Sequence, residues 1–308
     1  MQTIILTSCF VLSFLLSTQF VSCAEPSKIR SQPQTNVTLK NEDGNYARYL
    51  ASLKFPDYLS FCGERVPLDI PEVRERAERE FYINLQTPGQ LILYIKRAGR
   101  YFPLFEKILK EDNAPDDLKY LAVAESALYM ARSTKDAVGM WQFIPATGKR
   151  MGLQIDEYVD ERRHPEKSTR AAIEYLRSGY KKYKSWTLAA AGYNMGHENV
   201  GNNLDFQEKT SFYDLYLNEE TSRYVLRIAM VKELMEHADK YGLTLDKQTV
   251  YRDTAVKMVS WESQISDLSE WAMKHGTTYK DVKILNPWIL KRNLPAPKNG
   301  SYQILIPK

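Results

Sequence analysis

The segment Leu121–Gln142, with the sequence LAVAESALYMARSTKDAVGMWQ, determines how the rest of the chain is organised. An apolar helical face runs into it, with residues at i, i+3, i+4 and i+7: Leu118, Leu121, Ala122 and Glu125. Glu125 therefore points where apolar side chains point. A carboxyl group that loses its hydration has a raised pKa, so it can hold a proton near neutral pH. A proton held in this way is what a general acid needs.

The helix that carries Glu125 has recognisable start signals. We expect it to begin at Asn113 as the N-cap, with Pro115 in its first turn. We expect it to end between Met130 and Ser133. A structural interpretation of Glu125 is also open, because an acid on such a face is often paired with an arginine or lysine of another helix.

Three motifs in a fixed order favour catalysis over that structural ion pair. They are Glu125-Ser126, Gly139-Met140-Trp141-Gln142 and Tyr193-Asn194-Met195-Gly196. Together they resemble the lytic transglycosylases of the lysozyme-like superfamily, which cleave the glycan strands of peptidoglycan. The resemblance covers about residues 110 to 230. It implies a mainly α fold, in which a lysozyme-like α-helical catalytic domain occupies residues 67–245.

The resemblance also implies roles for single residues. Glu125 matches the catalytic acid of the family. The residues expected to bind the substrate are Ser126, Met140, Gln142, Tyr193, Asn194 and Tyr224. Trp141 stands where the family usually has methionine, and Gly192 where it usually has alanine. For Met140 the alternative is an ordinary core position, and for Tyr224 it is helix packing.

The last part of the chain has a different pattern. It predicts a strand at 256–259, helices at 265–275 and 278–285, and a closing strand at 302–306. This βααβ order resembles a LysM module, a binder of N-acetylglucosamine polymers, at residues 250–308. Ser263-Gln264-Ile265 replaces the Gly-Asp-Thr that is usual before the first helix. The small α+β fold is therefore better supported than sugar binding, and a module that only packs on the catalytic domain is the alternative. We expect the module to be separable from catalysis.

The N-terminal segment predicts export. Residues 1–23 carry no charged side chain, and Ile4–Leu16 is an apolar run of signal-peptide length. Phe20-Val21-Ser22-Cys23 resembles a bacterial lipobox, which would lipidate Cys23 and anchor the protein to the outer membrane. The alternative is cleavage after Ala24 without a lipid. Residues 24–66 are expected to form a polar tether and an extended segment in the periplasm.

Composition narrows the partners. The chain has 308 residues, 44% hydrophobic and 26% charged, as in soluble globular proteins with one to three domains. A net charge of +4 suits an anionic polymer such as a cell wall. No run of like charge indicates a nucleic-acid partner. No spacing of His and Cys indicates a metal, and we expect no cofactor.

The chemistry implied by the resemblance needs one carboxylate. Glu125 would protonate the glycosidic oxygen and then take a proton from the MurNAc 6-hydroxyl, which gives a 1,6-anhydro ring. Asp136, Asp160 and Glu161 lie in polar or charged runs, and we interpret the last two as surface ion pairs. Two alternatives are a peptidoglycan hydrolase similar to goose-type lysozyme and a non-catalytic wall-binding protein.

Overall fold

The computed structural model describes residues 44–245 and 249–308. The predicted signal segment, with Cys23, and residues 24–43 of the predicted tether lie outside these ranges. Residues 44–52, predicted as tether or extended chain, are helical instead. No helix within the described ranges combines the length and apolarity that a membrane span requires.

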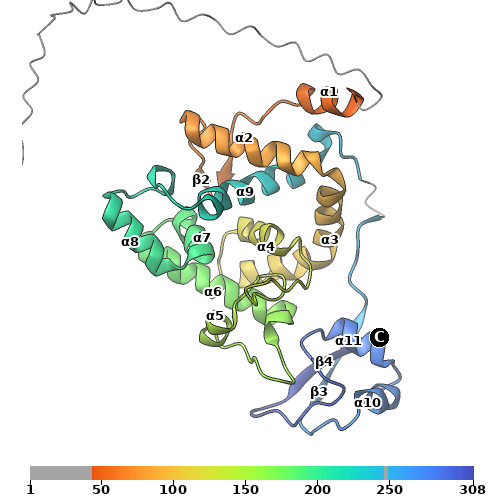
Figure 1. Cartoon of the computed structure of the whole chain (residues 1–308). Coiled ribbons are helices and arrows are strands. Elements are labelled where there is room, and N and C mark those ends of the chain that lie inside the picture. Colours follow the sequence, from red (N-terminus) through yellow and green to blue (C-terminus); the bar gives the residue numbers. More distant parts are fainter. Residues whose placement is uncertain (1–43, 246–248) are drawn as a thin grey trace, which may run out of the picture. The chain divides into compact units, whose positions relative to one another are not determined.

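The first described part, residues 44–245, is helical, with a two-stranded hairpin near its start (Figure 1). Its α-helices are α1 (Gly44–Ser52), α2 (Pro71–Gln86), α3 (Pro88–Glu111), α4 (Lys119–Ser126), α5 (Pro145–Arg150), α6 (Pro165–Tyr183), α7 (Trp186–Met195), α8 (His197–Gln207) and α9 (Glu219–Glu236). Short 3₁₀ turns connect them: η1 (Asp116–Leu118), η2 (Glu161–Arg163), η3 (Phe212–Asp214) and η4 (Ala238–Tyr241). The hairpin pairs β1 (Ser60–Phe61) with β2 (Glu64–Arg65).

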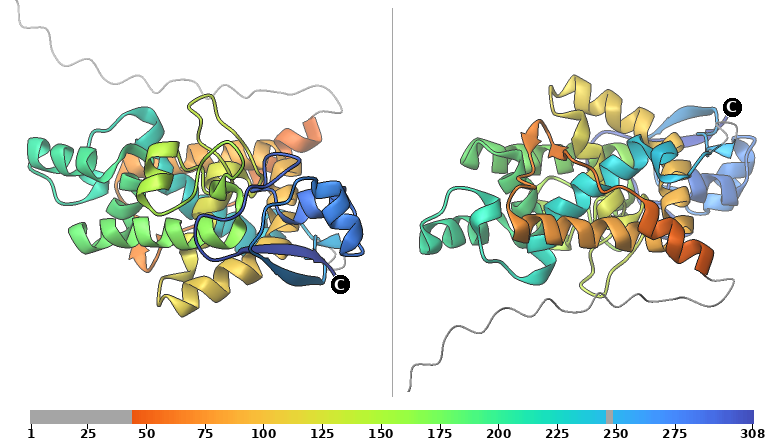
Figure 2. Two further views of the ribbon diagram at one scale, coloured as in Figure 1. Left: turned by 90° about the horizontal axis from the view of Figure 1, so that it is seen from below. Right: turned by 90° about the horizontal axis from the view of Figure 1, so that it is seen from above.

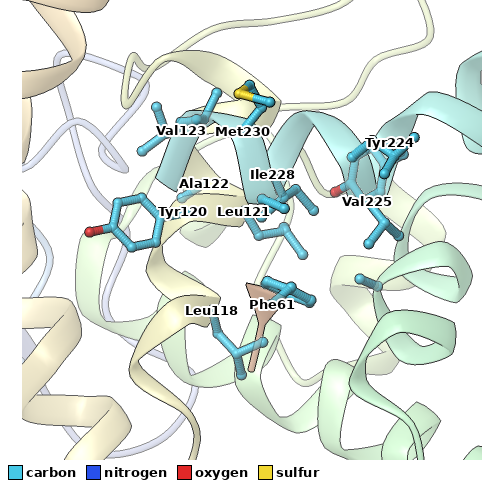
Figure 3. Packing of buried hydrophobic residues seen from close by; sticks show 14 of the residues in the cluster. Phe61, Leu118, Tyr120, Leu121, Ala122, Val123, Tyr224, Val225, Ile228 and Met230 are labelled. Carbon is cyan, nitrogen blue, oxygen red and sulfur yellow. The ribbon is translucent and has the colours of Figure 1, made fainter. Parts of the chain in front are cut away.

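Helix α9 runs through the core of this part. It packs against α2, α4 and α7, and Figure 1 shows it beside α2. Figure 3 shows its contact with α4, where Leu118 and Leu121 lie near Phe61, Val225 and Ile228. All five side chains are fully buried. The apolar face predicted ahead of Glu125 is therefore the face that α9 covers, and burying it supplies much of the driving force for this packing.

The predicted bounds of the Glu125 helix are wrong at both ends. Asn113 has a φ of +50° and lies outside the helix, which starts as η1 and continues as α4. The helix ends at Ser126 because Ala127 and Leu128 both adopt left-handed backbone angles. A guanidinium nitrogen of Arg97 donates to the Ala127 carbonyl at 2.9 Å. Glu125 therefore lies in the last turn of its helix, next to a sharp change in chain direction.

Pro103 lies inside a continuous helix. Helix α3 runs without interruption from Pro88 to Glu111, although a proline inside a helix removes one backbone hydrogen bond. Phe105, Ile108 and Leu109 lie on the buried side of the helix after the proline. Their packing keeps the last turns helical, which shows tertiary contacts overriding a local propensity.

The C-terminal module has the predicted βααβ order. Its elements are β3 (Val256–Trp261), α10 (Leu268–Lys274), α11 (Tyr279–Leu285) and β4 (Tyr302–Pro307). The strands pair antiparallel with Val259 opposite Ile304, and Figure 2 shows them side by side. Asn286 is fully buried, and its side-chain amide bonds the backbone of Leu305 in both directions, at 2.8 and 2.7 Å. That pair of bonds fixes the end of α11 against β4.

Two neighbouring residues of the helical part, Tyr158 and Val159, pack with the module's core. Val159 is fully buried in the module's apolar cluster and forms a β-bridge with Ile289. The Asp160 amide donates to the Trp288 carbonyl at 2.9 Å, and the Leu290 amide donates to the Tyr158 carbonyl at 2.8 Å. The two parts therefore meet through backbone hydrogen bonds as well as side chains.

Candidate active site

A cleft of about 560 Å³ opens beside the end of α4, within the size range of small-ligand sites. Five segments line it: the end of α4, the loop before α5 with the first turn of α5, Tyr175 of α6, the end of α7, and the first half of α9. Glu125, Gln142, Tyr193, Asn194 and Tyr224 are among the lining residues. The fold therefore brings five of the predicted site residues together, although they come from segments about 100 positions apart.

Glu125 lies where its charge is poorly solvated. Burial raises the pKa of its carboxyl from 4.5 to about 7. A hydrogen bond from Tyr224 and the charge of Arg227 lower that pKa, and the charge of Glu220 raises it. The last turn of a helix adds a negative dipole end, which also disfavours a carboxylate. The group can thus both give and take a proton near neutral pH.

Two tyrosine side chains, those of Tyr193 and Tyr224, lie near this carboxyl group. The Tyr224 hydroxyl donates to Oε1 of Glu125. The Tyr193 hydroxyl donates to the Trp141 carbonyl at 2.7 Å. Burial, and then the charge of Glu125, raise the pKa of both phenols well above the usual value. Both tyrosines therefore remain protonated donors, and Tyr224 orients the carboxyl directly.

The loop before α5 is held in an unusual backbone conformation. Asp136 and Gln142 have φ angles of +59° and +49°, and Gly139 has +87°. Positive φ in residues other than glycine needs support from the surroundings. The support comes from Arg162, which donates to the Asp136 carbonyl at 2.7 Å and to the Phe143 carbonyl at 3.0 Å.

Arg162 is itself fixed by a buried ion pair. Its Nε and Nη2 bond both carboxylate oxygens of Asp160, at 2.9 and 2.8 Å. The side chains of Arg162 and Asp160 are 4% and 7% exposed. The expectation of a surface ion pair at Asp160 is therefore wrong: the pair exists, but it is buried and holds the cleft loop.

Two predicted binding residues hold the cleft from behind. The Ser126 hydroxyl donates to the Met140 carbonyl at 2.8 Å and so ties the end of α4 to the loop. Met140 is 1% exposed and packs in the core. Neither residue is among those that line the cleft. The structure gives them a supporting position.

Gln142 and Asn194 both line the cleft, but they differ in how their side chains are hydrogen-bonded. The Gln142 amide nitrogen donates to the Gly139 carbonyl at 2.7 Å, and within the described residues its carbonyl oxygen accepts no hydrogen bond. Asn194 is bonded on both sides: it accepts from Thr221 at 2.7 Å and donates to Glu220 at 3.3 Å. Gln142 therefore offers an acceptor to a ligand, whereas Asn194 ties the end of α7 to the start of α9.

Two charged residues that α9 contributes to the cleft were not singled out by the sequence motifs. Glu220 and Arg227 line it together with Tyr224. The three residues lie at i, i+4 and i+7 on α9, so the helical spacing that located Glu125 would also have found them. Glu220 is a second carboxylate in the cleft, and Arg227 is a fixed positive charge beside Glu125.

Metal and thiol chemistry find no support in the described residues. Within them, no group of three or more His, Cys, Asp or Glu side chains lies close enough to hold a metal ion. Burial raises the pKa of the Cys62 thiol well above its usual value, which makes it a poor nucleophile.

Both parts of the chain match known family models. Residues 102–215 match the family described as "Transglycosylase SLT domain". Residues 257–308 match the family described as "Soluble lytic transglycosylase C-terminal LysM-like domain". These matches agree with the helical part and with the βααβ module.

Individual proteins are also similar to this chain. "Membrane-bound lytic murein transglycosylase D" of Escherichia coli, in strains K12 and O6:H1, is 28% identical over 259 residues, which are 82% of this chain and 56% of the relative. The chain thus spans about half the length of the curated relatives it matches. A solved structure of an inactive mutant of lytic transglycosylase Slt from Pseudomonas aeruginosa is 18% identical, with a TM-score of 0.35, and covers 49% of this chain and 26% of the other.

Proposed function

We propose that this chain, which carries a transglycosylase SLT domain and a LysM-like C-terminal domain, is a lytic transglycosylase of peptidoglycan. It would cleave the β-1,4 linkage from MurNAc to GlcNAc. The observation that carries the proposal is Glu125, a carboxyl with a pKa of about 7, hydrogen-bonded by Tyr224 inside a cleft of about 560 Å³.

The first step uses Glu125 as an acid. It donates its proton to the glycosidic oxygen, and the bond from C1 of MurNAc to that oxygen breaks. The leaving sugar departs with a hydroxyl group. Positive charge develops at C1, and the substrate's own acetamido group stabilises it. The Glu125 carboxylate left behind accepts the Tyr224 hydrogen bond more strongly, because bonds to ionised acceptors are stronger.

The second step uses Glu125 as a base. It removes the proton from the 6-hydroxyl of the same MurNAc, and that oxygen forms a new bond to C1. The product is a 1,6-anhydro ring, no water is consumed, and Glu125 has its proton back. The hydroxyl is already bound, so its attack avoids the entropy cost of capturing water.

A hydrolase is the second candidate, and one observation favours it. Glu220 lines the same cleft, and hydrolysis by inverting enzymes needs a second carboxylate to activate water. Against this, the side chain of Asn194 donates a hydrogen bond to the Glu220 carboxylate at 3.3 Å. Glu220 is therefore engaged in joining α9 to the end of α7.

The test is the mass of the fragments released from purified sacculi. Muropeptides that end in 1,6-anhydro-MurNAc, lighter by one water than hydrolytic products, support the proposal. Reducing ends as the dominant product, together with their loss in Glu220→Gln, would establish the hydrolase. Glu125→Gln should retain less than a few per cent of the activity while its circular dichroism is unchanged. Wild-type activity in that variant would leave Glu125 with a structural role.

We also propose an envelope location. The predicted signal segment ends at Cys23 or Ala24, and the relatives are named membrane-bound. Labelled palmitate would enter the wild-type protein but not Cys23→Ser if Cys23 is lipidated. An unlabelled wild-type protein recovered in the soluble periplasmic fraction would favour cleavage after Ala24. Peptidoglycan strands are the expected partner of the LysM-like module, and a pull-down on sacculi with residues 250–308 deleted measures that contribution.

A further inference from the structure

We propose that Arg227 is a recognition site for a carboxylate of the substrate, held in the cleft by the buried Glu80. This inference rests on the proposed function, since it takes the ligand to be a peptidoglycan fragment. Arg227 lines the cleft on the same face of α9 as Glu220 and Tyr224. Its side chain is 30% exposed, so a ligand in the cleft can reach it.

Glu80 explains why Arg227 stays in place. Glu80 projects from α2, and its side chain is 1% exposed. A buried carboxylate is stable only when it is paired. Its Oε1 lies 2.5 Å from Nε of Arg223, and its Oε2 lies 3.5 Å from Nε of Arg227. Both arginines come from α9, so one acid of α2 fixes two guanidinium groups of the neighbouring helix.

The charges in this cluster do not cancel. Arg223 has a second acid, because its Nη1 lies 3.3 Å from Glu219. Arg227 shares Glu80 and has no other ion pair in the described part of the chain. Within the described residues, neither terminal nitrogen of Arg227 donates a hydrogen bond, so both keep donors available for a ligand. The guanidinium is thus a held cation with unused donors at the wall of a cleft.

The chemistry of the substrate suggests what those donors bind. Two N–H groups of a guanidinium match the two oxygens of a carboxylate. The sugar hydroxyls and acetamido groups of peptidoglycan are neutral. Its carboxylates lie on the stem peptides, or on the lactyl ether where no peptide is attached. A bound carboxylate would also offset the positive charge that lowers the pKa of Glu125, and so would keep the acid protonated when substrate is present.

Lys135 is the rival cation in the cleft. It lies on the exposed loop that faces α9, and in the described ranges its ammonium group has no ion pair. A lysine that no neighbouring residue immobilises loses more side-chain conformational entropy on binding than an arginine already held by an ion pair. Arg227 is already immobilised by Glu80, so it is the better placed of the two.

The experiment measures binding in the full-length Glu125→Gln background, where nothing is cleaved. The probes are soluble disaccharide-repeat fragments in three forms: with native stem peptides, with the stems removed by an amidase so that only the lactyl carboxylate remains, and with every carboxylate chemically amidated. Calorimetry gives the Kd of each. We expect the added Arg227→Gln change to weaken native fragments about tenfold or more and to leave the amidated fragments within about twofold.

The matched control is Arg223→Gln, which also removes a partner of Glu80 but does not line the cleft. It should weaken native and amidated fragments equally. A loss on stem-bearing fragments assigns the stem carboxylate, and a loss confined to stem-free fragments assigns the lactyl carboxylate. Equal losses on native and amidated probes in Arg227→Gln, or a substrate-dependent loss in Lys135→Gln instead, overturn the proposal. Because no turnover is needed, this result is independent of whether the product is an anhydro sugar.

Discussion

Replacing Glu125 with glutamine should stabilise the protein in alkaline solution while it abolishes activity. The pKa of this carboxyl is raised from 4.5 to about 7 in the folded state. Because the pKa of this acid is higher in the folded state, the folded protein binds more protons than the unfolded protein between those two pH values. Stability is therefore fully present below pH 4.5 and falls as the pH rises through about 7.

The size of the effect follows from the same two values. Each unit of pKa difference corresponds to about 1.36 kcal/mol, so ionising Glu125 in the folded protein costs about 3 kcal/mol above pH 8. Glutamine carries no charge, and its carbonyl oxygen can still accept the Tyr224 hydroxyl. Glu125→Gln should thus raise the free energy of unfolding by up to about 3 kcal/mol at pH 8 and leave it nearly unchanged at pH 4.

Urea unfolding of both proteins at the two pH values measures this difference. The control is Glu219→Gln, an exposed acid on α9 that is paired with Arg79. The pKa of Glu219 is lowered, first by its hydrogen bond from Arg79, so its replacement should not stabilise the protein at pH 8. If Glu125→Gln changed stability equally at both pH values, burial would not be raising the pKa of Glu125, and the argument for a general acid would lose its basis.

Three further outcomes are expected. Tyr224→Phe removes a hydrogen bond that favours the ionised form of Glu125. The alkaline limb of the pH profile of kcat/KM should therefore move up from about pH 7 by up to about one pH unit. An unmoved limb would contradict the hydrogen bond between Tyr224 and Glu125. Gly139→Ala should lower the free energy of unfolding by about 2 to 4 kcal/mol in thermal unfolding, because the added Cβ would lie 2.0 Å from a backbone carbonyl oxygen. The control is Gly63→Ala, which has a φ of +79° but open space around it and should cost only about 1 kcal/mol. A chain ending at residue 247 should still cleave sacculi, but it should melt at a lower temperature because Val159 becomes exposed. An unchanged melting temperature would show that the contact of Val159 with the module does not contribute to stability.

The sequence located the chemistry better than the backbone around it. The spacing of Leu118, Leu121 and Glu125 placed the carboxyl correctly on the core-facing side of its helix, since that spacing depends only on helical geometry. The end of that helix was misjudged because Ala127 and Leu128 carry no signal for left-handed backbone angles. Those angles are imposed by the surroundings, for example by the Arg97 hydrogen bond to the Ala127 carbonyl.

Charged residues were the hardest to interpret from the sequence. Asp160 and Arg162 sit in a run that has the composition of a solvated turn, yet both are buried. Burial of a charge depends on its partner and on what covers the pair, and neither is encoded locally. Glu80 shows the same limitation, because its arginine partners on α9 lie more than 140 positions away in the chain.

The segment that joins the two parts of the chain also supports the cleft. Val159 enters the module's core, and the Asp160 amide beside it donates to the Trp288 carbonyl. The Asp160 carboxylate fixes Arg162, whose guanidinium holds the carbonyls of Asp136 and Phe143 on the cleft loop. One continuous set of hydrogen bonds therefore runs from the module to the backbone around Gln142. Because a strained loop stays in place only while its supports hold, loss of the module should loosen the cleft even though no module residue lines it.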